Sequence, residues 1–218
     1  GPYNNEGNTP PMYSAYERFF MGWLTPELII DSANIVLEEL NSSLHALLIS
    51  ENDQHNLIGN DPNPTKFYLL ENRQQKGWDE YLPGHGLMLT YVQYNQKKWA
   101  DNTVNNTEKN MGVDLIEADG KAPEYNTGKA QDLFPAGATA YLKIEGHAIE
   151  EIQEIDGVIK FKYRGGIMET AIEDVVVDEG VIAIYNILGQ KQTTTSIEHL
   201  PCGAYVVVKT NGSYKIVR

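Results

Sequence analysis

The sequence predicts a mainly β protein: a β-sandwich-like region with one N-terminal helix, followed by a small Ig-like all-β module. Short runs rich in Ile, Val, Leu and Tyr recur along most of the chain and end at Gly, Pro, Asn or Asp, which is typical of strands joined by turns. Only one stretch, near the start, has aromatic residues at helical spacing. The last 44 residues differ, because they consist of short strands broken by turns that contain glycine, so we expect two domains, 1–168 and 169–218.

The helix is predicted over residues 11–24. Tyr13, Tyr16, Phe19 and Trp23 recur three or four residues apart, which places them on one helical face. A proline pair stands where the helix would begin, and Gly22 and a Thr-Pro pair stand where it would end. We expect the aromatic stripe to face the core, because aromatic side chains bury well.

Strands are predicted through the rest of the first region. The stretch 43–51 fits helix or strand, and we interpret it as a strand because strand-like runs follow it. Phe134 is expected to anchor a tucked loop, and Asp156-Gly157 and Asn211-Gly212 are expected to form hairpin turns. The predicted strands are 27–30, 33–40, 43–51, 67–71, 86–94, 112–118, 141–147, 148–157, 158–166, 171–180, 181–190, 203–212 and 213–218.

Composition excludes few classes of function. The chain has 218 residues, of which 41% are hydrophobic, so it can bury a core. Its net charge of -13 argues against nucleic-acid binding, which needs clustered Lys and Arg. No apolar run is long enough for a membrane helix, so we expect a protein that is not transmembrane. The single cysteine, Cys202, cannot form an internal disulfide, and we expect it to be a small buried residue.

No self-sufficient catalytic motif is present. The sequence has five histidines but no H-E-x-x-H zinc motif, and it has neither a G-x-S-x-G nor a phosphate-binding loop motif. His147 begins H-A-I-E-E, which approaches an inverted zinc motif but lacks its second histidine, so we interpret His147 as a surface strand residue.

Acidic residues offer two weaker alternatives. The pairs Asp79/Glu80 and Glu117/Asp119 could act as glycosidase carboxylates, but solvated loop acids are commoner. Asn- and Asp-rich loops at 4–8, 60–63 and 101–106 could bind calcium through oxygen, although none has EF-hand spacing.

Residues 1–166 resemble the region after the active site in M6-family (immune inhibitor A-like) zinc metallopeptidases, with forms from Bacteroidota the most similar. The resemblance rests on YNNEGNTPPMYSAYERFFMGWL, on FYLLENRQQKGWDEYLPGHGLMLTYVQYN, and on the following W…N.VN…VDLIEADG blocks. In that family the H-E-x-x-H helix comes just before the first block. The resemblance therefore implies that zinc and the catalytic glutamate belong to an upstream domain outside this chain, and we interpret the opening GPYNNEGNTPP as part of a fragment. The family commonly has His-Val-Asp-Tyr where this chain has Tyr91-Val92-Gln93-Tyr94.

Residues 178–218 are similar to C-terminal sorting modules of the type IX (Por) secretion system. The similarity is carried by VIAIYNILGQKQ and by IEHLPCGAYVVVKTNGSYKIVR. It implies secretion to the outside or cell surface of a Gram-negative bacterium, with the secretion machinery as a partner.

Two functions follow as expectations. The first is a non-catalytic part of a secreted M6-like peptidase, which supports its own upstream catalytic domain and is inactive alone. The second is a cell-surface module that binds a glycan or a host protein through loop aromatics, although such rings more often fold onto the domain's own core. The candidate binding residues, in loops at 78–85 and 99–106 and beyond, are Trp78, Tyr81, His85, Trp99 and Tyr125.

Overall fold

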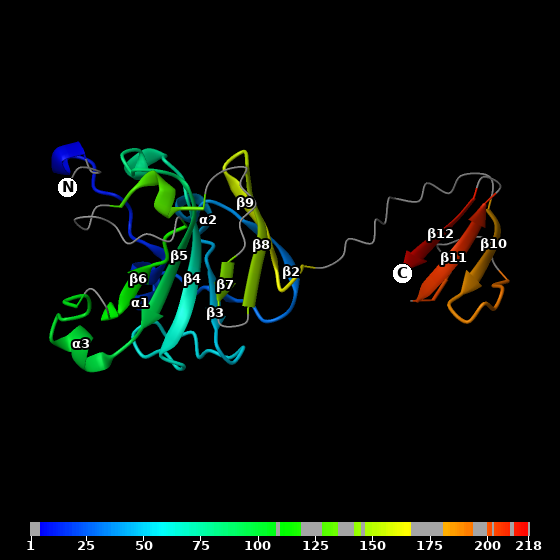
Figure 1. Cartoon of the computed structure of the whole chain (residues 1–218), viewed down its shortest axis with the longest axis horizontal. Helices are drawn as coiled ribbons and strands as arrows, with labels where there is room; N and C mark the ends of the chain where they lie inside the picture. The colour runs from blue at the N-terminus through cyan, green and yellow to red at the C-terminus, as the bar shows by residue number, and fades with distance from the viewer. Residues whose placement is uncertain are drawn as a thin grey trace. The chain divides into compact units, whose positions relative to one another are not determined.

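The chain consists of two compact units, Gly1–Ile167 and Met168–Arg218, which are described separately (Figure 1). The structure is a computed structural model. It describes residues 5–107, 110–118, 128–134, 142–144, 147–166, 181–193, 200–201, 203–209 and 212–217. The predicted strand 171–180, Tyr125, Asp119 and Cys202 lie outside the described residues.

In the described residues of the first unit, the strands form a five-stranded and a four-stranded sheet. The five-stranded sheet has the order β1-β3-β4-β5-β6, and the four-stranded sheet has the order β2-β9-β8-β7. Only the β1–β3 pair is parallel. The strands are β1 (Glu27–Leu28), β2 (Ala33–Leu37), β3 (Leu47–Ser50), β4 (Lys66–Arg73), β5 (Gly86–Gln93), β6 (Val113–Leu115), β7 (Leu142–Ile144), β8 (His147–Ile155) and β9 (Val158–Tyr163).

One face of the five-stranded sheet packs on the four-stranded sheet, and we call it the sandwich face (Figure 1). Side chains alternate between the faces of a strand, so β4 sends Leu70 to this face and Leu69 to the other. The shared core contains Leu47, Ile49, Leu87 and Leu89 from one sheet and Ile149, Ile152, Ile159, Phe161 and Tyr163 from the other. The predicted mainly β, sandwich-like fold is confirmed.

The opposite face, which we call the helix face, is covered by helix α1 (Ala15–Phe20). The helix is much shorter than the predicted 11–24. Ser14 and Glu17 form a capping box that sets its start, and the backbone bonds Gly22 N–H to Phe19 O and Trp23 N–H to Arg18 O close a Schellman-type end. Gly22 supplies the positive φ of 72° that this end requires.

The aromatic stripe is therefore divided. Tyr16 and Phe19 are buried against the sheet, as expected for core residues. Tyr13 precedes the helix and Trp23 follows it, and these two rings are 55% and 56% exposed. The prediction that the whole stripe faces the core is wrong, because the aromatic spacing extends beyond both ends of the helix, to Tyr13 and Trp23.

Most strand predictions in the first unit are confirmed, including the ambiguous stretch that became β3. The prediction of a single helix missed the short helices α2 (Leu40–Ser43) and α3 (Gln96–Ala100), and the 3-10 turns η1 (Asn5–Gly7), η2 (Gly77–Asp79) and η5 (Ala130–Asp132). Asp156 and Gly157 both have positive φ, 53° and 79°, as the tight hairpin between β8 and β9 requires. Phe134 anchors its loop as predicted, buried in the sandwich core with its N–H bonded to Leu87 O.

The second unit contains a three-stranded antiparallel sheet of β10 (Val181–Asn186), β11 (Ala204–Lys209) and β12 (Gly212–Val217). Its small core holds Ile184, Leu200, Tyr205 and Val207. The predicted turn at Asn211-Gly212 begins outside the described residues, and Gly212 pairs with Lys209 as the first residue of β12.

A turn of the second unit explains part of its Tyr-Asn-x-Leu-Gly-Gln pattern. The Asn186 Oδ1 atom accepts the N–H groups of Leu188 and Gln190, and Gly189 adopts a φ of 76°. Ile187 and Leu188 at this turn are 73% and 78% exposed. The motif residues thus build a tight turn that presents two apolar side chains to solvent.

Candidate functional site

A cluster of charged side chains is buried on the helix face, at the end of β4. Phe67, Leu69, Glu71 and Arg73 alternate onto this face, so the apolar first half of the strand is followed by two charges. Asp79 of η2 and Arg18 of α1 join them. We call Arg18, Glu71, Arg73 and Asp79 the ion cluster, and none of the four is more than 5% exposed.

The ion cluster is internally paired. Arg73 Nη2 lies 2.9 Å from Asp79 Oδ1, and Arg73 Nη1 lies 3.3 Å from Glu71 Oε1. Asn41 donates to Asp79 Oδ2 at 2.6 Å and accepts a bond from Arg18 Nη2 at 2.5 Å. Two acids and two arginines balance, which is what allows ionic groups to remain buried.

The ion cluster also holds the segment that leads into α1. Met12 N–H donates to Asp79 Oδ1 at 2.9 Å, and Ala15 N–H donates to Glu71 Oε2. Arg73 donates to the carbonyl of Met12 at 3.0 Å, and Arg18 Nε donates to the carbonyl of Tyr13 at 2.9 Å. Residues 12–15 are therefore fixed to β4 by charge-assisted hydrogen bonds.

Burial sets the electrostatics of the ion cluster. It raises the pKa of Glu71, against the opposing effect of Arg73 and the Ala15 N–H. It also lowers the pKa of Arg18, with the neighbouring Arg73 as the next cause. Asp79 is thus a structural acid with several partners, whereas a solvated loop acid was expected. Glu80 is exposed, so the predicted pair has one buried and one exposed member.

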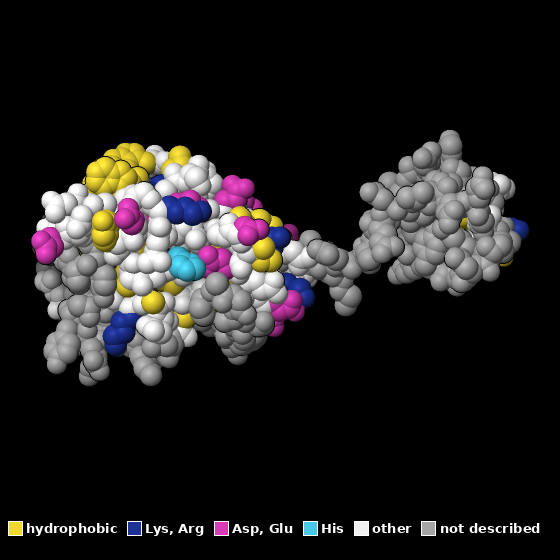
Figure 2. Space-filling model, turned by 90° about the horizontal axis from the view of Figure 1, so that it is seen from above, with side chains coloured by type: hydrophobic (Ala, Val, Ile, Leu, Met, Phe, Trp, Pro, Cys, Tyr) yellow, Lys and Arg dark blue, Asp and Glu magenta, His cyan; other side chains and the backbone are white. Residues whose placement is uncertain are grey.

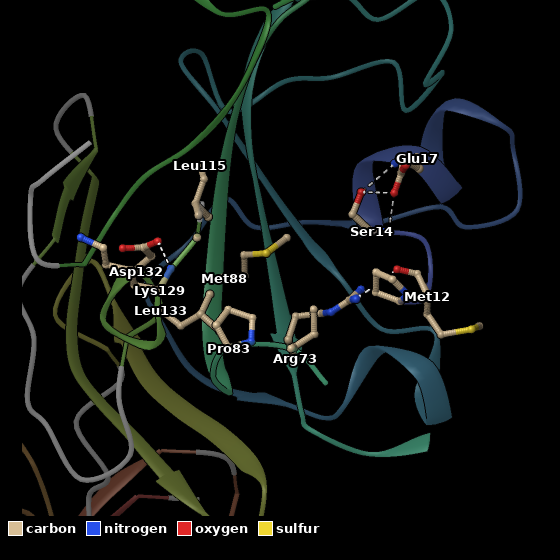
Figure 3. Close-up of a pocket in the computed structure, with 13 residues that line it drawn as sticks. Met12, Ser14, Glu17, Arg73, Pro83, Met88, Leu115, Lys129, Asp132 and Leu133 are labelled. Atoms are coloured by element: carbon tan, nitrogen blue, oxygen red, sulfur yellow. Dashed lines mark hydrogen bonds between the residues drawn. The ribbon is translucent and has the colours of Figure 1, made fainter. Parts of the chain in front are cut away.

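An open hollow of about 190 Å³ lies beside the ion cluster (Figure 3). Figure 3 shows Met88 and Leu115 between the Lys129–Leu133 segment and the Arg73–Met12 side. Apolar side chains form much of the lining, and two residues of each charge, Glu17, Asp132, Arg73 and Lys129, complete it. Such a hollow suits an apolar side chain from a partner better than a reacting group, because it lacks a paired nucleophile and base.

The predicted site residues Trp78 and Tyr81 lie in and just after η2, 55% and 39% exposed. Neither lines the hollow of Figure 3, although Leu82 and Pro83 next to them do. His85 follows in the same loop, and its Nδ1 lies 2.9 Å from Glu154 Oε1 of β8. The structure therefore brings these three residues into one loop, with His85 tied to the other sheet.

Trp99 lies elsewhere, on α3. Its ring packs against Tyr94 at 4.9 Å and against Tyr16 at 6.2 Å between centroids, so it is half-buried on the helix face. The expectation that loop aromatics fold onto the domain's own core holds for Trp99 and fails for Trp78, which is largely exposed.

His147 is buried, and the interpretation of a surface residue is wrong. Tyr163 Oη donates to its Nδ1 at 2.5 Å, and Arg164 Nη2 lies 2.8 Å from the same nitrogen. Arg164 is itself paired with Asp53 at 2.8 Å. Burial and then the Arg164 charge lower the pKa of His147, so its imidazole is neutral. Because Arg164 contacts both His147 and Asp53, this group links the β3–β4 connection to the four-stranded sheet.

The candidate calcium loops use their amide side chains internally. In loop 4–8, Asn8 donates to the Asn5 carbonyl, and in loop 101–106, Asn105 Oδ1 accepts the N–H groups of Gly112 and Val113. The backbone N–H of Asn63, in loop 60–63, donates to the side chain of Asn56. Within the described residues, no group of three or more His, Cys, Asp or Glu side chains could hold a metal ion. No described helix is long and apolar enough to cross a membrane.

Sequence reasoning missed the ion cluster and Glu154. The alternation of Phe67, Leu69, Glu71 and Arg73 along β4 was the signal that could have found the cluster. Comparison with protein-family models, with curated proteins and with solved structures finds no match for this chain.

Proposed function

We propose that this chain is the non-catalytic C-terminal part of a secreted M6-like zinc metallopeptidase, in which the first unit supports an upstream catalytic domain. The sequence blocks quoted above suggest the family. The observation that carries the supporting role is the ion cluster, which fixes residues 12–15 to β4.

The position of the ion cluster gives this role a physical basis. In the resembled family the catalytic helix precedes the block that here spans residues 3–24. A segment held by buried ion pairs and backbone hydrogen bonds cannot shift without leaving charges unpaired, which is costly. The β-sandwich would therefore give the preceding domain a rigid base.

An exposed apolar surface next to the ion cluster is the proposed contact. We call Met12, Trp78 and Tyr81 the η2 surface; their side chains are 36%, 55% and 39% exposed. The Met12–Asp79 hydrogen bond holds its two segments together. Figure 2 shows exposed hydrophobic side chains among acidic ones on one face of this unit. Apolar groups gathered in this way are typical of contact surfaces.

The test has two parts. The purified 218-residue chain, incubated with casein and zinc, should show no chelator-sensitive cleavage, and such cleavage would contradict a non-catalytic role. The gene should encode an H-E-x-x-H motif within about fifty codons before Gly1. An upstream reading frame without that motif would remove the peptidase assignment.

The second unit is proposed to serve secretion. Its support is the resemblance to sorting modules and the turn that exposes Ile187 and Leu188. Removing residues 168–218 from the chain in a Bacteroidota host with this secretion system should keep the protein inside the cell. Normal secretion of the shortened protein would refute the role.

A binding module for glycan or host protein is the alternative, favoured by the exposure of Trp78 and Tyr81 in one loop. Aromatic rings on a surface can stack on sugars or anchor an interface. A glycan array probed with wild type and with Trp78→Ala distinguishes the binding module from the supporting role. Wild-type binding lost in the variant would favour this function, whereas an array without signal removes its sugar version.

A further inference from the structure

A second hollow, of about 260 Å³, is also lined by Glu17 and is walled mainly by aromatic rings. Tyr13, Tyr16, Phe20, Trp23 and Trp99 line it together with Glu17, and we call these residues the aromatic hollow. The rings contact one another in pairs. Tyr13 and Trp23 meet edge to face with their centroids 5.5 Å apart, and Tyr16 and Phe20 meet at a tilt with their centroids 6.2 Å apart. The volume suits a ligand smaller than a typical drug.

Two polar groups of the hollow have unused hydrogen-bonding capacity. Tyr16 is only 7% exposed; the Trp99 side chain approaches its buried hydroxyl as a donor, and no group among the described residues accepts the hydroxyl proton. Burial raises the pKa of Tyr16 well above its usual range, so the hydroxyl keeps its proton and can donate. A buried donor without an acceptor is unfavourable, and an acceptor atom of a ligand would offset that cost.

Glu17 gives the hollow a negative charge. Its Oε2 accepts bonds from the N–H and hydroxyl of Ser14, at 2.7 Å and 2.9 Å. No Lys or Arg in the described part of the chain forms an ion pair with Glu17. The lysines beside Trp99 do not line the hollow, since Lys97 pairs with Asp101 and Lys98 reaches the Asn110 carbonyl.

We propose that the aromatic hollow binds an alkylated ammonium cation of the choline type. Ring faces attract a cation through their quadrupole, Glu17 adds a full opposite charge, and the Tyr16 hydroxyl can donate to the oxygen of the ligand. The net charge of -13 also favours a cation. An anion would meet Glu17, and a purely apolar ligand would leave both polar groups unused.

The test compares choline with its neutral isostere, 3,3-dimethylbutan-1-ol, by ligand-observed NMR titration of the 218-residue chain. Choline should bind saturably and about three- to thirtyfold more tightly than the isostere, since the difference isolates the charge. Equal binding would overturn the proposal, because the hollow would then be only apolar. No saturable choline binding would overturn it as well.

Four variants locate the binding. Trp23→Ala should weaken choline binding about tenfold, whereas Trp78→Ala, which removes a tryptophan of almost equal exposure, should leave it unchanged. Glu17→Gln should weaken choline binding but not isostere binding, while keeping the capping box that Gln also forms. Tyr16→Phe should abolish the preference for choline over tetramethylammonium. Equal losses in Trp23→Ala and Trp78→Ala would place the binding elsewhere and refute the site.

Phosphocholine head groups of lipids carry the same cation as free choline. Vesicle binding therefore tests whether the natural ligand is a lipid head group or a soluble cation. Sedimentation with phosphatidylcholine vesicles that free choline reverses would assign the hollow to a head group. Choline binding without sedimentation would assign it to a soluble cation. A protein that sediments equally with phosphatidylglycerol vesicles, unaffected by choline, would contradict recognition of the cation.

Discussion

The two faces of the five-stranded sheet bury their side chains in different ways. On the sandwich face, Ile, Leu, Phe and Tyr residues contributed mainly by two sheets form the core, and the uncharged side chains of Asn72 and Gln74 are buried at its edge. The helix face combines aromatic rings with the ion cluster, and a six-residue helix with its flanking loops covers it. The buried charges of the ion cluster and the two hollows described above thus lie on the helix face, and we look for binding there.

The largest effect is expected from breaking the ion cluster. Asp79→Ala should lower the free energy of unfolding by about 3–5 kcal/mol, because Arg73 would stay buried without its closest carboxylate. Glu80→Ala, an exposed acid one residue away, should change it by less than about 0.5 kcal/mol. Urea unfolding measures both. Equal effects would mean that the charges of the helix face do not hold residues 12–15 in place.

A matched leucine pair on β4 compares the faces directly. Leu70 points to the sandwich face and Leu69 to the helix face, and neither is more than 1% exposed. We expect Leu70→Ala to cost about 3–4 kcal/mol and Leu69→Ala about 2 kcal/mol, because the cost of a cavity depends on how well its surroundings collapse. A short helix can move further than a sheet. A larger loss for Leu69→Ala would reverse the comparison.

Acid should weaken both faces through two histidines, of which His147 is buried and His55 is half-buried. Burial lowers the pKa of His55, which packs against Phe19 and Phe67 on the helix face, to about 4, and the pKa of His147 is also lowered. The unfolded chain binds a proton at each site near pH 6.5 and the folded chain does not, so stability falls as pH drops below about 6.5.

For His55 alone the loss between pH 7 and pH 5 should be about 1–2 kcal/mol. Urea unfolding at both values should show a smaller pH dependence for His55→Gln than for wild type. A variant that retains the full dependence would show that His55 is not a source of it.

How far the sequence predicted these results depends on the range of the interactions. The strands and the Asp156-Gly157 turn follow from local alternation and turn chemistry. The helix was overextended because the aromatic spacing continues beyond Ser14 and Gly22, where capping stops it. The alternation along β4 indicates Glu71 and Arg73, whereas His147 and Glu154 meet partners from distant segments, so no local pattern could reveal their contacts. The aromatic hollow was missed for the same reason, because Trp99 and Trp23 are far apart in sequence.

The smallest effect on stability is expected at the turn of the second unit. Replacing Ile187 and Leu188 with Ser should change the free energy of unfolding by less than about 0.5 kcal/mol, because both side chains are largely exposed. Secretion from a Bacteroidota host should nevertheless fall if this turn is recognised. Unchanged secretion would mean that the apolar turn has no role in export. As a control, Val207→Ala in the small core should destabilise the second unit while leaving the turn residues unchanged.

The chain leaves the five-stranded sheet after β1, places β2 in the four-stranded sheet, and returns as β3. Ala33 of β2 pairs with Tyr163 of β9, which is synthesised much later. Contacts between such distant segments are slow to form. Nearly the whole first unit must therefore leave the ribosome before the two sheets can pack together. Until then, core side chains such as Leu37 and Leu70 remain exposed and can be bound by chaperones. For an exported protein, that delay would extend the time in which the chain remains unfolded enough to be moved.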